Sequence, residues 1–134
     1  MKRVLTAAMV WMIMMTGAMA ETPQEGAKAI LDLIKARNYQ ELFPTRYSEW
    51  HKVEAEGVPV DKAVEKLSRM FEKKHEMIVG MYEQLATADF TMGKSEIVQK
   101  GETGDMATAE VTVGDKKVPF RLYKMENGKW GFHL

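Results

Sequence analysis

His75 is the side chain whose position in the sequence best suits proton transfer or contact with a ligand. It lies four residues after Phe71 and three before Ile78, and this spacing puts it on the apolar stripe of a predicted helix. An imidazole changes its charge near neutral pH, so within a pocket it could carry a proton or contact a ligand. The alternative is a partly buried histidine at the edge of the stripe, which the charged residues flanking it in sequence favour.

Carboxylates supply only a weak candidate for a general base. Acid–base catalysis in an apolar pocket needs an inward-facing carboxylate, with a tyrosine or protonated acid opposite it to stabilise an oxyanion. Most acids near the predicted strands are explained by turns, a helix end or a polar strand face: Asp89, Asp105, Glu110, Asp115 and Glu126. Glu96 or His75 remains as the base, with Tyr82 or Tyr123 as donor. We therefore predict no dedicated catalytic residue.

Amphipathic aromatic residues are spread over several predicted elements, and they either pack in the core or line a cavity for an apolar molecule. With His75 and Arg121 as the polar contacts, the predicted ligand-binding residues are Trp50, His75, Tyr82, Arg121 and Tyr123. His51 and His133 have no partner at ligand spacing. The sequence predicts neither a metal site nor a cofactor.

Two helices are expected to open the fold. Thr22 to Glu25 spell a capping box with proline at the first helical position, so a helix should begin there and end at Asn38 in the left-handed conformation. A short helix over 39–43 should stop at Pro44, which disfavours helical geometry at Phe43.

Two further helices are expected before residue 90. The first covers 45–56 and ends at Gly57. The second is a single long helix over 62–86, capped by Asp61 and carrying one apolar stripe that includes Val64, Leu67 and Phe71. A helix of that length could lie across a whole sheet.

Beyond Asp89 the hydrophobic period changes to two, which predicts strands over 94–100, 106–113, 118–125 and 130–134. Turns fall at 101–105, at 114–116 and at Asn127-Gly128, where the dipeptide favours a type I′ hairpin. Pro119 should lie at an edge or a bulge. Helices followed by an antiparallel meander predict an α+β fold, with a curved four-stranded sheet packed on the helices.

The first twenty residues have the layout of a signal peptide. Lys2 and Arg3 precede an apolar run over 4–15, and Ala18 and Ala20 fit a cleavage site after Ala20. We expect a signal peptide at 1–20, one domain at 21–134, and a periplasmic or secreted product. Residues 21–134 carry 17 basic and 19 acidic side chains and no cysteine, which argues against nucleic-acid binding, disulfides and thiolate chemistry. They contain no apolar run long enough for a membrane anchor.

Several motifs together resemble the nuclear-transport-factor-like (cystatin-like) superfamily, especially its small exported bacterial proteins whose domain has no assigned function. They are the Thr-Pro-x-Glu helix start, Lys35 to Tyr39, Gly104 to Val111 and Asn127 to Trp130. The resemblance implies a cone, in which a bent sheet encloses a cavity against the helices. Ketosteroid isomerase, scytalone dehydratase and polyketide cyclases place acid and base residues there, whereas other members only bind or dimerise. The lipoprotein members carry an acceptor cysteine that this sequence lacks.

The sequence thus predicts an exported, non-enzymatic binding protein for a small apolar molecule or a protein partner. One alternative is a lyase or isomerase that uses the cone cavity. Another is a homodimeric interaction or immunity-type module. Fold alone does not separate the three.

Overall fold

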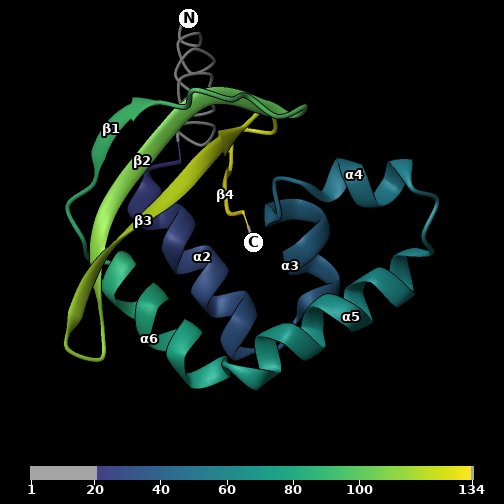
Figure 1. Ribbon diagram of the computed structural model, residues 1–134, viewed down its shortest axis with the longest axis horizontal. Coiled ribbons are helices and arrows are strands. Elements are labelled where there is room, and N and C mark those ends of the chain that lie inside the picture. The colour runs from purple at the N-terminus through teal and green to yellow at the C-terminus, as the bar shows by residue number, and fades with distance from the viewer. Residues whose placement is uncertain (1–20, 134) are drawn as a thin grey trace, which may run out of the picture.

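The computed structural model describes residues 21–133, so the predicted signal peptide and Leu134 lie outside the described residues. Helices α2 to α6 come first, and the antiparallel strands β1 to β4 follow in the order β1-β2-β3-β4. The predicted α+β class is confirmed. In Figure 1 the sheet bends over α2 and α6, whereas α3, α4 and α5 lie on the other side of the molecule.

Helix α2 (Pro23–Lys35) begins as predicted. The Thr22 hydroxyl accepts a bond from the Glu25 amide at 3.1 Å, and the Glu25 carboxylate accepts one from the Thr22 amide at 2.9 Å. The left-handed residue at its end is Arg37 (φ 54°), not Asn38. The Asn38 amide reaches back to the Leu33 carbonyl at 2.9 Å, which places the left-handed residue one position earlier.

Helix α3 (Tyr39–Arg46) continues through Pro44, so the predicted stop at that proline is wrong, and Phe43 is helical. The last turn is held instead by the Thr45 hydroxyl, which donates to the Glu41 carbonyl at 2.6 Å. Helix α4 (Trp50–Ala55) is shorter than the predicted 45–56, because Tyr47 forms an isolated parallel bridge with Phe132. Gly57 ends α4 with φ 73°, as expected.

The predicted long helix is two helices, α5 (Val60–Lys73) and α6 (His75–Leu85), with a break at Lys74 (φ −126°, ψ 28°). The two halves pack on different partners: α5 contacts α3 and α4, whereas α6 contacts α2 and β2. A straight helix could not follow both surfaces. Pro59 occupies the N-cap position, so Asp61 lies within the first turn instead of capping it.

Strand β1 (Thr91–Lys94) ends where the predicted strand was to begin, and residues 95–101 form a loop. The expected turn at 101–105 is instead the start of β2 (Glu102–Val113), which is irregular between Glu102 and Met106. The alternation in β2 is confirmed, because Ala107, Ala109 and Val111 are buried and the intervening residues are not.

Strands β3 (Lys116–Met125) and β4 (Trp130–Gly131) complete the sheet. Because β4 pairs with β3 only at Tyr123 and Lys124, Pro119 lies at a free edge, as expected. Asn127-Gly128 does form the hairpin connection, but only Gly128 has positive φ (85°), so the turn is not type I′. The Asn127 side chain accepts the Lys129 amide at 2.9 Å.

The hydrophobic core occupies the space between the helices and the sheet. Phe43 and Phe132 are fully buried, and Phe71 packs against both rings at 5.0 and 5.8 Å. Leu122 from β3 and Ile30 from α2 belong to the same buried cluster. The buried cluster thus draws side chains from both the helices and the sheet.

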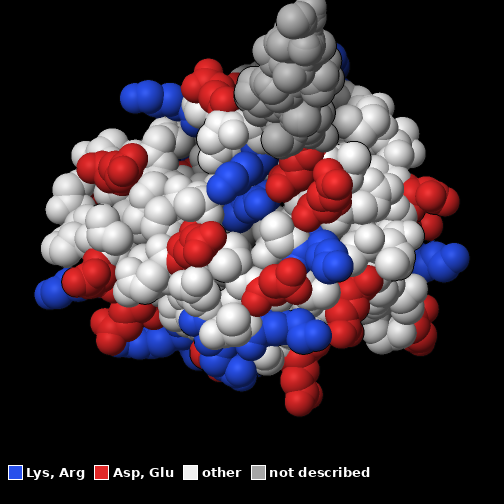
Figure 2. Space-filling model, turned by 180° about the vertical axis from the view of Figure 1, so that it is seen from behind, with Lys and Arg blue, Asp and Glu red and all other residues white. Residues whose placement is uncertain are grey.

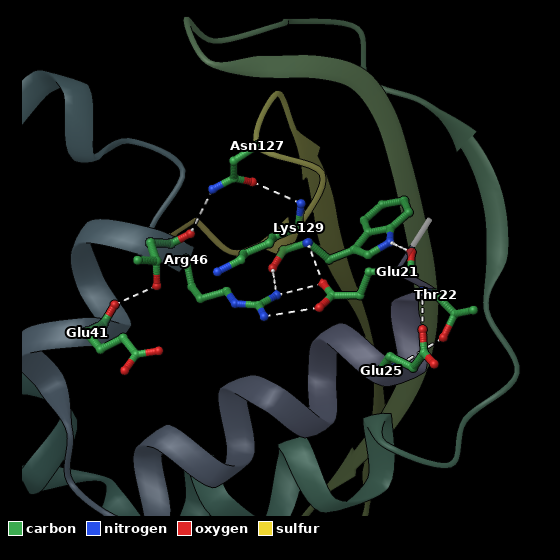
Figure 3. Close-up of polar contacts among 9 residues, drawn as sticks. Glu21, Thr22, Glu25, Glu41, Arg46, Asn127 and Lys129 are labelled. Atoms are coloured by element: carbon green, nitrogen blue, oxygen red, sulfur yellow. Dashed lines mark hydrogen bonds and ion pairs between the residues drawn. The ribbon is translucent and has the colours of Figure 1, made fainter. Parts of the chain in front are cut away.

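A buried ion pair joins the beginning and the end of the described chain (Figure 3). The Arg46 guanidinium donates to both carboxylate oxygens of Glu21, at 2.7 and 3.1 Å, and to the Trp130 carbonyl at 2.9 Å. The Trp130 amide donates to the same carboxylate at 3.0 Å, and its indole donates to the Glu21 carbonyl at 2.8 Å. Because the Arg46 side chain is only 6% exposed, its charge depends on these partners.

The Glu21–Arg46 ion pair makes the free energy of unfolding depend on pH in the acid range. Burial alone would raise the pKa of Glu21, but the hydrogen bonds from Arg46 and the Trp130 amide hold this pKa below its ordinary value of 4.5. The resulting stabilisation is complete above that pH and is lost as the pH falls through the lower folded-state pKa. In urea unfolding at a series of pH values, Glu21→Gln should therefore flatten the acid limb, and an unchanged limb would contradict this.

Removal of the Arg46 guanidinium should lower the free energy of unfolding more than the neutralisation of Glu21 does. Arg46→Ala leaves the Glu21 carboxylate partly buried without a counter-charge, so the free energy of unfolding at neutral pH should fall by about 3 kcal/mol. Arg69→Ala, which removes an exposed arginine paired with Glu65, is the control and should change it by less than about 1 kcal/mol.

Two helical glycines should respond in opposite ways to alanine. A Cβ at Gly26 would lie 2.7 Å from the Trp130 Cβ, whereas a Cβ at Gly80 would meet nothing within 4 Å. Gly26→Ala should therefore destabilise the fold by about 1–3 kcal/mol through overpacking. Gly80→Ala should stabilise it by about 0.5–1 kcal/mol, because it lowers the entropy of the unfolded chain. Thermal unfolding of both variants tests the pair, and shifts of the same sign would refute it.

Candidate functional site

The five predicted ligand-binding residues do not share one site. Trp50 begins α4 and is buried in the core cluster. Tyr82 lies in α6 at 3% exposure, edge-on to Phe120 with ring centroids 5.4 Å apart, and burial raises the pKa of its phenol far above 10. Neither side chain is positioned around an open pocket with the others.

His75 lies at the break between α5 and α6, where it lines a surface hollow with Arg37 and Glu72. Its Nδ1 is buried and has no hydrogen-bond partner within residues 21–133. Arg121 and Tyr123 are the only two of the five that line the same hollow, on the outer face of the sheet. Glu96 lines that hollow together with Tyr123, whereas its alternative partner Tyr82 is buried in the core.

A largely apolar hollow lies between α4 and α5, and we call it the helical groove. It has a volume of about 390 Å³, within the range of small-molecule pockets. Its lining is mainly aliphatic and aromatic: Tyr47, Val53, Glu56, Val58, Lys62, Ala63, Lys66, Leu67 and Met70. This composition suits an apolar ligand.

Helix α5 presents two apolar faces, which explains why the groove forms. Val64 and Phe71 are buried in the core. Ala63, Leu67 and Met70 follow each other at steps of four and three residues and line the groove, although Ala63 is also buried and Leu67 packs partly against the core. The sequence prediction placed Leu67 on the same stripe as Val64 and Phe71 and did not recognise a groove-lining face, although the spacing from Ala63 to Met70 is visible in the sequence.

Apolar side chains of the groove remain uncovered. Val58 is 38% exposed and Met70 is 47% exposed, and the adjoining Val60 is also exposed at 47%. Single exposed apolar residues are ordinary, but a contiguous group beside a hollow is typical of binding surfaces. The chain turns at Gly57 and Pro59, so α5 runs back beside α4. Helix α4 therefore forms the wall of the groove opposite α5.

The polar groups of the groove are few and mostly uncommitted. Lys62 and Lys66 lie four residues apart on α5, and neither these two nor Glu56 forms an ion pair within the described chain. Burial, followed by the nearby Glu49 carboxylate, raises the pKa of the Tyr47 phenol, which therefore stays neutral near pH 7. The groove thus offers two ammonium groups at its rim.

The described residues offer the groove no obvious catalytic apparatus. Its lining contains one carboxylate and no histidine. Among residues 21–133 there is no group of three or more metal-ligating side chains.

None of the helices in this part of the chain is long and apolar enough to cross a membrane. In Figure 2, acidic and basic side chains are interspersed over the face shown.

Comparison with known proteins adds no relative. No family model, no curated protein and no solved structure matches the chain. The similarity to the nuclear-transport-factor-like superfamily therefore stays a prediction, and the function must be argued from the site itself.

Proposed function

We propose that this protein is a non-enzymatic binding protein that holds a small apolar molecule with an anionic head group in the helical groove. The observation that carries the proposal is the apolar lining of the groove, in which Met70 and Val58 are exposed to solvent and Leu67 and Val53 are partly buried. Burial of such a surface by a ligand is favourable at roughly 25 cal/mol per Å². Export of the protein remains a prediction from its first twenty residues.

The two lysines at the rim support an anionic head group. Lys62 and Lys66 have no carboxylate partner within residues 21–133, so a ligand anion would meet charges that the fold itself leaves unbalanced. An aliphatic carboxylate has both parts that the groove accommodates: a chain for the apolar lining and a charge for the rim.

The alternative of a lyase or isomerase has less support. It needs a base and a donor inside a cavity enclosed by the sheet, but His75 lies at a helix break and Tyr82 is buried in the core. Glu96 and Tyr123 do line one hollow, which lies on the outer face of the sheet. A dimeric module needs a self-complementary surface, and no observation on these residues selects one. Binding of a small molecule therefore remains the preferred function.

Calorimetric titration with decanoate tests the proposal. The protein should bind decanoate more tightly than decanol, and Met70→Glu should weaken decanoate binding at least tenfold, because a carboxylate in the groove repels the ligand and costs desolvation. Met77→Glu is the matched control, since Met77 is 41% exposed but lies outside the groove. Equal loss in the two variants, or no binding to the unaltered protein, would refute the proposal.

The lysines are tested in the same way. The double change Lys62→Gln and Lys66→Gln should reduce the preference for decanoate over decanol while decanol binding stays within about twofold. If the preference survives this double change, the head group is not held at the rim.

A further inference from the structure

A second hollow lies on the outer face of the sheet, and we call it the sheet-side hollow. It has a volume of about 600 Å³ and lies between the 94–99 segment and the side chains of Met106, Arg121, Tyr123 and His133. It shares no lining residue with the helical groove. The two sites can therefore be altered separately.

Arg121 is the one arginine within residues 21–133 that has no carboxylate partner. The other three form ion pairs, with Glu72, Glu21 and Glu65, at 2.9, 2.7 and 3.2 Å. On β2, Thr108 stands directly opposite Arg121, and the neighbouring Glu110 makes no ion pair with it. The guanidinium is left available to a ligand.

The acids around this hollow are largely committed to other partners. Asp105 pairs with Lys94. Glu102, whose side chain is 1% exposed, pairs through Oε2 with the His133 Nε2 at 2.7 Å. The other oxygen of Glu102 accepts the Gln99 amide at 3.0 Å. Only Glu96 remains as a lining carboxylate without an ion pair in the described chain.

His133 and Tyr123 form a stacked aromatic pair in the lining of the hollow, and we call this pair the Tyr123–His133 wall. Their rings are stacked with centroids 3.7 Å apart and planes 6° from parallel. The buried carboxylate of Glu102 fixes the orientation of the imidazole, as outer carboxylates orient histidines in many sites. Sequence spacing gave His133 no partner, because Glu102 is 31 residues away. Met106 and Ile97 add apolar surface to the lining.

We propose that the sheet-side hollow is a second binding site, which takes a small aromatic carboxylate. The Arg121 guanidinium forms the charge-assisted, two-pronged pair that planar carboxylates accept. The ligand ring lies against the Tyr123–His133 wall, where aromatic contact adds to the burial of apolar surface. This assignment does not depend on the ligand of the helical groove.

The test is a titration of the protein with benzoate, followed in assigned ¹H–¹⁵N spectra. Shifts should concentrate in the 94–99 segment and around Arg121 and Tyr123. Arg121→Gln should weaken binding at least tenfold, and Arg121→Lys should weaken it less, because lysine keeps the charge but loses the fork. Arg69→Gln, which removes an exposed arginine elsewhere, is the control and should leave binding unchanged.

Two further probes separate the parts of the interaction. Benzamide keeps the ring without the charge, and acetate keeps the charge without the ring, so both should bind more weakly than benzoate. Equal binding of either probe would overturn the assignment. So would shifts confined to α4 and α5, or scattered over lysines at the surface, or unchanged affinity in Arg121→Gln.

Separate controls establish that the Arg121→Gln variant is folded and that the benzoate site is independent of the helical groove. The dispersion of the Arg121→Gln spectrum reports whether the variant is folded, and if it is not, Arg121→Lys decides the outcome. Met70→Glu, which blocks the helical groove, should leave benzoate affinity within about twofold. Failure of decanoate binding therefore does not imply failure of benzoate binding, or the reverse.

Discussion

The buried pair of Glu21 and Arg46 is the interaction on which the rest of the structure depends. It joins the residue before the first helix cap, the end of α3 and the strand β4, which are separated by as many as 109 residues. Strand β4 has only two residues and could not hold its position by pairing with β3 alone. Together with the hydrogen bonds that join the Phe132 backbone to Arg46 and Ser48, this pair positions Trp130 and Phe132 in the core and His133 beside Glu102.

The break at Lys74 gives the two halves of the predicted long helix different surroundings. Helix α6 covers the sheet together with α2, and its buried Tyr82 and Leu85 belong to the core. Helix α5 turns away from the sheet, so its second apolar face is left to line the helical groove with α4. Core side chains pack between α2, α6 and the sheet, and both hollows proposed as sites lie at the surface.

Charged side chains have ion-pair partners in the core but lack them at the two candidate sites. Inside the fold, each buried ion is matched: Arg46 by Glu21, and Glu102 by His133 and the Gln99 amide. At the sites, Lys62, Lys66 and Arg121 have no ion-pair partner in the described chain. Exposed charges gain little from pairing, so leaving them unmatched costs the fold little, and these are the cations to which we propose that ligands bind.

The sequence by itself determined the elements that depend on near neighbours. The capping box at Thr22, the alternation of β2 and the hairpin at Asn127-Gly128 follow from contacts within a few residues, and their order determined the α+β class. Only the tertiary structure decided the break at Lys74, the shift of β1 to 91–94 and both hollows. Periodicity records which side chains share a face, but the partner of that face, like the partner of His133, comes from distant parts of the chain.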